Sequence, residues 1–182
     1  GGSTAIVVRA DNYYWTETLT FNGVPVDGAA QTRAYTSVWA NIYADGTAAV
    51  TFAEALAALG TPEWWLAQHG LTNGGASFSE AETNDTDSDT FKAWQEFVAD
   101  TDPTNGKSFF QCLEISVQKL PVIGTVIRWN TASGRVYTID GNTNLPASWF
   151  GLATNLPPSG VWTDTTHGAN NSINYRLGVS KE

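Results

Sequence analysis

Alternating apolar and polar positions fill the first third of the chain. The runs are rich in β-branched and aromatic residues, which favour strands, and turn residues separate them. Asn22-Gly23 and Asp45-Gly46 tolerate positive φ at both centres of a type I′ turn, so we expect a hairpin at each dipeptide. The pattern predicts an N-terminal β region of residues 1–60.

The hydrophobic period changes after residue 51. A capping-box pattern predicts a short helix over residues 53–59, ended by a glycine. Thr61-Pro62 opens a second helix that ends at His69-Gly70, since proline suits the first turn and glycine the end. A polar linker is expected over residues 71–83, and one or two helical turns over residues 91–99.

Six short apolar runs follow residue 107 at close spacing, divided by clusters of glycine, proline and asparagine. Dense short strands of this kind are typical of a β-sandwich. Cys112 lies in the first of these runs. As the single cysteine it cannot form a disulfide within the chain, so we expect a small buried apolar side chain there.

Charge excludes some classes of function. The 182 residues hold 9 Lys plus Arg and 18 Asp plus Glu, a formal net charge of −9. Nucleic acids need a basic stripe, so no nucleic-acid partner is expected. No run of 18 apolar residues is present, and no membrane span is expected. The chain begins Gly-Gly-Ser and holds no Met, which indicates a processed chain and agrees with export.

Catalytic chemistry has little support in the sequence. The residues able to act as imidazole or thiol ligands are His69, His167 and Cys112, and their separation does not match a zinc site. No G-x-S-x-G pattern of a serine hydrolase occurs. We therefore expect no enzyme and assign no catalytic residue.

Acidic residues concentrate in the middle of the chain, and the window 85–96 places them at positions 1, 3, 5 and 12. Ca²⁺ takes six to eight oxygen ligands, which a loop with alternate ligands and a closing glutamate supplies. Thr90 and Ala93 stand at positions 6 and 9, where a glycine and an oxygen ligand are usual. The alternative is a solvated acidic loop. The expected calcium ligands are the side chains of Asp85, Asp87, Asp89 and Glu96 and the carbonyl of Phe91.

Residues 61–105 carry a Trp-Leu and Gly-Leu helix, the acidic loop, and the ending Thr-Asp-Pro-Thr. Together with Trp129, Gly134-Arg135 and Tyr175-Arg176, they resemble the C-terminal segment of exported bacterial proteins. In that family a thrombospondin type 3-like or dockerin-like calcium loop precedes an immunoglobulin-like β-sandwich. The resemblance covers residues 61–179 and implies secretion, bound Ca²⁺ and a non-catalytic role. Asp100 stands where the family has Gly.

We predict a mostly β fold in three parts: an N-terminal β region (1–60), a helix and calcium-loop connector (61–106) and a C-terminal immunoglobulin-like β-sandwich (107–182). The expected function is a calcium-stabilised structural or adhesive subunit, extracellular or on the cell surface. Residues 1–8 form a strand that pairs within its own fold or adds to a neighbouring copy, building a filament or surface layer. The alternative is a carbohydrate-binding module of a secreted bacterial enzyme, with polysaccharide as its partner and Tyr13-Tyr14-Trp15 or Trp149-Phe150 as candidate stacking residues. Strand alternation places Tyr13 and Trp15 on one side and Tyr14 on the other, so the first cluster cannot be one flat platform.

Overall fold

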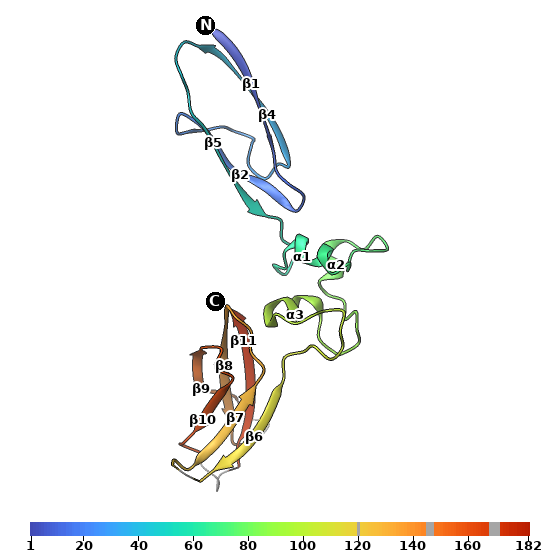
Figure 1. The fold of residues 1–182 in the computed structure, drawn as a ribbon, viewed down its shortest axis with the longest axis vertical. Helices are drawn as coiled ribbons and strands as arrows, with labels where there is room; N and C mark the ends of the chain where they lie inside the picture. Colours follow the sequence, from blue (N-terminus) through green and yellow to red (C-terminus); the bar gives the residue numbers. More distant parts are fainter. Residues whose placement is uncertain (120, 145–147, 168–171) are drawn as a thin grey trace. The chain divides into compact units, whose positions relative to one another are not determined.

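The computed structural model describes residues 1–119, 121–144, 148–167 and 172–182. The chain divides into two compact units, Gly1–Thr83 and Asn84–Glu182. Both are built mainly of antiparallel strands (Figure 1), so the prediction of a mostly β fold is confirmed. Within the described ranges, no helix has the length and apolar character needed to cross a membrane.

Five strands of the N-terminal unit form two small sheets. A three-stranded sheet has the order β3-β2-β5, and a two-stranded sheet pairs β1 with β4. Val8, Leu19 and Ala29 form the buried cluster of this region. The strands are β1 (Gly2–Arg9), β2 (Tyr14–Phe21), β3 (Val24–Pro25), β4 (Ala34–Ile42) and β5 (Ala48–Glu54).

One of the two predicted hairpins is confirmed. Asn22 and Gly23 have φ values of 50° and 79°, and they join β2 directly to its antiparallel neighbour β3. The hairpin at Asp45-Gly46 is wrong, because β4 pairs with β1 and β5 pairs with β2. Alternation predicted both strands but carried no information about their partners. The side chain of Asn22 instead accepts a hydrogen bond from the Thr47 N–H at 2.8 Å, which holds the start of β5.

The helix predicted over residues 53–59 is also wrong. Strand β5 runs through Glu54, and the next N–H, of Ala55, donates to the carbonyl of Tyr13 at 2.7 Å. Cross-strand hydrogen bonds therefore satisfy the backbone that the capping pattern assigned to a first helical turn.

Two short helices follow in the N-terminal unit. The predicted helix at Thr61-Pro62 is present as α1 (Glu63–Gln68), which buries Trp65 and Leu66. The segment expected to be a linker contains α2 (Phe78–Ala81), whose capping box joins Ser77 and Glu80. A helix of four residues shows too little periodicity to be recognised in the sequence.

The C-terminal unit holds α3 and two three-stranded sheets, of order β10-β7-β6 and β11-β8-β9. Ile127 and Trp129 of β7 pack with Tyr137 and Ile139 of β8, so the core lies between the sheets. All six predicted runs form strands. The elements are α3 (Ala93–Ala99), β6 (Cys112–Gln118), β7 (Gly124–Trp129), β8 (Arg135–Asn142), β9 (Phe150–Leu156), β10 (Val161–Asp164) and β11 (Asn174–Lys181).

The prediction that Cys112 is buried is wrong, since its side chain is exposed. Cys112 opens β6, which lies at the edge of its sheet and exposes most of its residues. An apolar run at a sheet edge has the same sequence pattern as one in the core, and only the topology separates them.

Candidate metal centre

The acidic loop lies between α2 and α3, and Asp85 determines its first turn. The Asp85 carboxylate accepts hydrogen bonds from the N–H groups of Ser88, Asp89 and Thr90 at 2.7, 3.2 and 2.9 Å. Aspartate commonly folds the following backbone around its side chain in this way. The loop therefore curls around the first of the predicted ligands.

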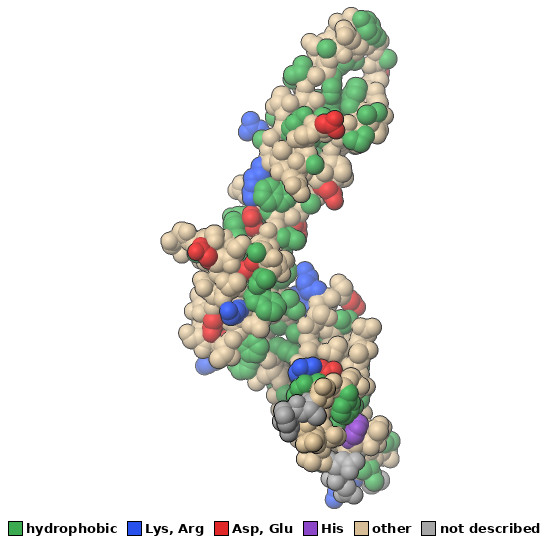
Figure 2. Space-filling model, turned by 180° about the vertical axis from the view of Figure 1, so that it is seen from behind, with side chains coloured by type: hydrophobic (Ala, Val, Ile, Leu, Met, Phe, Trp, Pro, Cys, Tyr) green, Lys and Arg blue, Asp and Glu red, His purple; other side chains and the backbone are tan. Residues whose placement is uncertain are grey.

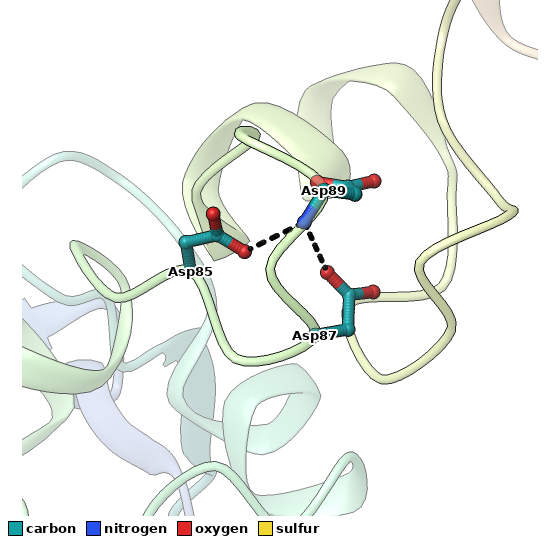
Figure 3. Close-up of side chains that lie close together, drawn as sticks. All are labelled: Asp85, Asp87 and Asp89. Atoms are coloured by element: carbon teal, nitrogen blue, oxygen red, sulfur yellow. Dashed lines mark hydrogen bonds between the residues drawn. The ribbon is translucent and has the colours of Figure 1, made fainter.

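The next two aspartates lie on the same curl. One oxygen of Asp87 accepts the Asp89 N–H at 3.3 Å, and one oxygen of Asp89 accepts the Phe91 N–H at 2.8 Å. Figure 3 shows the carboxylates of Asp85 and Asp87 turned toward the backbone nitrogen of Asp89. Ligand atoms of the three aspartates lie within 4.8 Å of one another, so this cluster could hold a metal ion.

Glu96 approaches the same region from α3. Its side chain is 1% exposed, and one oxygen accepts a 3.4 Å hydrogen bond from the Thr101 hydroxyl. Burial, together with the negative charges of Asp87 and Asp89, raises its pKa from an ordinary 4.5 to about 8. Burial and the neighbouring Asp89 carboxylate also raise the pKa of Asp87. The site therefore resists holding all its carboxylates ionised.

Three carboxylate oxygens at this site are buried without a hydrogen-bond partner among the described residues. They belong to Asp87 (Oδ2), Asp89 (Oδ2) and Glu96 (Oε2). Leaving a buried charged oxygen unpaired is costly, because water no longer solvates it. No lysine or arginine in the described part of the chain forms an ion pair with these three residues. Protonation of a carboxyl group, as the raised pKa of Glu96 indicates, or a bound cation would compensate their charge.

A second turn covers the loop from the C-terminal side of α3. A Cβ at Gly106 would lie 3.1 Å from the Asp87 carbonyl oxygen, so any larger residue would require the Asp87 backbone to shift by a few tenths of an ångström. Asp102 shapes the turn: its carboxylate accepts hydrogen bonds from the N–H and hydroxyl of Thr104 at 3.0 and 2.7 Å. The Asp-Pro-Thr-Asn-Gly sequence of this turn gives no sign that it covers the acidic loop.

Arg135 of β8 connects the end of α3 to the sheets. Its buried guanidinium donates to the carbonyls of Phe97 and Val98, the former at 2.9 Å. It also lies 3.5 Å from the carboxylate of Asp100. Asp100 ends the helix with a φ of 61°, a conformation in which glycine is most common. The glutamate of the site is thus carried by a helix that is anchored to the core.

The structure brings Asp85, Asp87 and Asp89 together and places Glu96 near the last two. Phe91 donates its N–H to Asp89, and the use of its carbonyl as a ligand stays a prediction. Sequence reasoning missed Gly106 and Arg135 as supports of this site. Comparisons with protein-family models, curated proteins and solved structures found no match for the chain.

Proposed function

We propose that the chain is a non-catalytic, calcium-stabilised structural or adhesive subunit that works outside the cell. The observation that carries the proposal is the set of three buried, unpartnered oxygens beside a cluster of three aspartates. A divalent cation would compensate their charges and tie the loop to α3. Because α3 is anchored to β8 through Arg135, the cation would stiffen the whole C-terminal unit.

Calcium suits these ligands better than magnesium does. Carboxylates spaced along one loop give a flexible, oxygen-only ligand set, whereas Mg²⁺ requires near-octahedral geometry and dehydrates reluctantly. A loop with Thr90 and Ala93 at its sixth and ninth positions departs from the tight binders, so we expect a Kd of about 10⁻⁴ to 10⁻³ M. Such an affinity functions only where calcium is plentiful, which supports an extracellular location.

The architecture agrees with a structural role. The resemblance to exported proteins with a calcium loop remains part of the proposal, as does the immunoglobulin-like arrangement of the two C-terminal sheets. Chains of this kind would join copies of themselves through strands into a filament or surface layer. The two packed sheets and the exposed strands of both units support this view.

Calcium titration with a matched variant tests the proposal. At about 2 mM calcium, the expected Kd corresponds to roughly 0.6–1.8 kcal/mol of added stability. The melting temperature should therefore rise by several degrees relative to the same sample in EDTA. Glu96→Gln should lose most of this rise while melting at or above the parent in EDTA, because a glutamine avoids the cost of protonating or burying a carboxylate.

Asp45→Asn, which removes an exposed acid far from the loop in sequence, is the control and should keep the full calcium response. Isothermal titration calorimetry should give one calcium ion per chain. A parent protein that releases no heat and melts equally in calcium and EDTA would show that the loop is only a solvated acidic turn.

A groove on the N-terminal unit favours carbohydrate binding as a second candidate function. It encloses about 530 Å³ and is lined by Trp15, Glu17, Gln31 and Glu54 among others. A β-bulge between Thr16 and Thr18 lets consecutive residues of β2 line one groove. An indole with nearby carboxylates and an amide is a suitable surface for a sugar ring.

The orientation of the indole is held from one side. The Arg33 guanidinium lies 4.7 Å from the centre of the Trp15 ring and pairs with Glu63 at 2.9 Å. Affinity electrophoresis in polysaccharide gels tests this function: retardation of the parent that Trp15→Ala abolishes and Trp149→Ala keeps would support it. Equal mobility of all three proteins across a polysaccharide panel would exclude it.

A further inference from the structure

Strand β6 leaves part of the C-terminal core uncovered. Ile115 pairs with Ile127 of β7, and residues paired in register lie on the same face of a sheet. Ile127 is fully buried in the core between the sheets, whereas Ile115 is 57% exposed. Val117, the next residue on this face, is 52% exposed. Among the residues that the structure describes, no layer therefore covers the inward-facing side chains of β6.

The facing sheet shares this opening. A cavity of about 270 Å³ is lined by Cys112 and Ile115 of β6 and by Tyr175 and Leu177 of β11. In the described part of the chain, β6 pairs with β7 alone and β11 with β8 alone. Both strands are thus unpaired edges, and their side chains line one apolar cavity. Figure 1 shows where β6 and β11 lie in the C-terminal unit.

This opening specifies the kind of group that would close it. A free edge presents unpaired N–H and C=O groups, which an extended backbone satisfies by adding as a strand. The exposed side chains at alternate positions of β6 require apolar side chains at alternate positions of the added strand. A small molecule or a helix would leave the edge hydrogen bonds unmade.

The chain carries a strand with these properties. Within the described residues β1 pairs with β4 alone, so its other edge is free. Ala5 is paired with Val38, which places both on one face together with Val7. Val7 is 55% and Val38 68% exposed, whereas Val8 on the opposite face is buried with Leu19. Figure 2 shows hydrophobic side chains on the surface of this unit.

We propose that β1 of one copy adds antiparallel to the free edge of β6 in a second copy, with Val7 opposite Ile115. The inference rests on the self-assembly proposed above and names the surfaces that join. The lengths match, at 8 and 7 residues. Every strand pair in the described part of the chain is antiparallel, and antiparallel pairing is slightly more stable per residue than parallel pairing.

The contact uses two different surfaces, so it repeats from copy to copy and builds an open filament or a closed ring. Strand β1 stays paired with β4, and its exposed face covers the cavity at Ile115. No refolding of either unit is needed for the addition.

Disulfide trapping tests the register. In a Cys112→Ser background, Val7→Cys with Ile115→Cys should give a ladder of covalent multimers on non-reducing gels after mild oxidation. Thr18→Cys with Ile115→Cys, which uses an exposed position on β2, is the control and should give no ladder. Ile115→Cys alone yielding dimers as efficiently as the pair would instead indicate that two β6 edges meet, and would overturn the proposal.

Mixing two blocked variants tests the polarity of the contact. Ile115→Glu blocks the β6 edge that receives the added strand, and Val7→Glu blocks the β1 strand that is added. Each variant alone should therefore weaken association at least tenfold by analytical ultracentrifugation. Their mixture should form heterodimers, because the intact β1 of the Ile115→Glu variant can add to the intact β6 edge of the Val7→Glu variant. Leu59→Glu, at a position 56% exposed, should assemble like the parent.

A parent that stays monomeric at high concentration, or a mixture without heterodimers, would overturn the proposal. Circular dichroism of each variant checks that it has folded. All samples contain calcium, and their melting temperatures are compared with those in EDTA. A calcium response without a ladder would refute strand addition alone, and a ladder without a calcium response would refute the metal site alone.

Discussion

Thr90 is held in a conformation that its branched side chain disfavours. Its φ is 83°, at the loop position where calcium loops of this spacing usually have glycine. A non-glycine residue in this region costs of order 1–3 kcal/mol. The loop keeps this strain because the Thr90 N–H donates to Asp85 at 2.9 Å, which fixes the curl that gathers the carboxylates.

Thr90→Gly should therefore stabilise the protein relative to Thr86→Gly, an exposed control in the same loop whose φ is not positive. Both variants gain the same backbone freedom when unfolded, so their difference isolates the strain. We expect Thr90→Gly to be more stable by about 1–2 kcal/mol. Urea unfolding in EDTA measures it, and equal midpoints would show that Thr90 is not strained.

Glu96 should make the stability of the calcium-free protein depend on pH. The folded state raises its pKa from 4.5 to about 8, so folding favours the protonated form. In the unfolded chain this carboxyl loses its proton near pH 4.5. The free energy of unfolding therefore falls as the pH rises from about 4.5 to about 8. Below pH 4.5 the Glu96 carboxyl is protonated in both the folded and the unfolded state, so it adds no pH dependence to the stability.

Melting temperatures in EDTA should consequently fall between about pH 5 and 8 in the parent, and fall less in Glu96→Gln, which cannot ionise. Because the pKa of Asp87 is also raised, the melting temperature of that variant should still fall with pH, but less steeply than that of the parent. In calcium the fall should be reduced, because the cation stabilises the ionised carboxylates. Parallel pH profiles for parent and variant in EDTA would contradict the assignment to Glu96.

At the scale of elements, Arg135 joins α3 to β8. Its guanidinium is the donor to two carbonyls at the helix end, and it is buried. Arg135→Leu would leave those carbonyls unpaired at a cost of about 1–3 kcal/mol each. It should also weaken calcium binding, since Glu96 would lose its fixed position.

Arg128→Leu is the matched control. Arg128 pairs with Glu114 at 3.3 Å, but both side chains are half exposed, and such pairs contribute roughly 0–1 kcal/mol. Thermal melting and calorimetry should therefore separate the two variants clearly. Equal effects would mean that Arg135 does not hold the helix in place.

Elements were predictable where the chain alone determines them. The six C-terminal strands follow from alternation, and α1 from its flanking Thr61-Pro62 and Gly70. Strand partners were not predictable, because alternation says which residues share a face and nothing about the neighbouring strand. The acidic spacing of residues 85–89 likewise predicted the cluster, whereas the support from Gly106 and Arg135 depends on tertiary contacts.

At the scale of the whole molecule, calcium should control access of proteases to the middle of the chain. The acidic loop and the turn that covers it bury few apolar side chains, so we expect their order to depend on the proposed cation. In EDTA, brief proteolysis should cut within residues 84–106 at least tenfold faster than in calcium. Mass spectrometry of the fragments locates the cut, and identical digestion in both buffers would argue against the site.

Under the proposed function, the crowding of Asp87, Asp89 and Glu96 would make the order of their loop depend on the calcium concentration around the chain. Inside a cell, where free calcium is scarce, mutual repulsion would keep their segment slack, which suits a polypeptide still on its way through an export channel. In a medium rich in calcium, the same carboxylates would bind the cation and the loop would become ordered. Calcium in the outer medium would then be sufficient to order the loop, with no enzyme needed for this step.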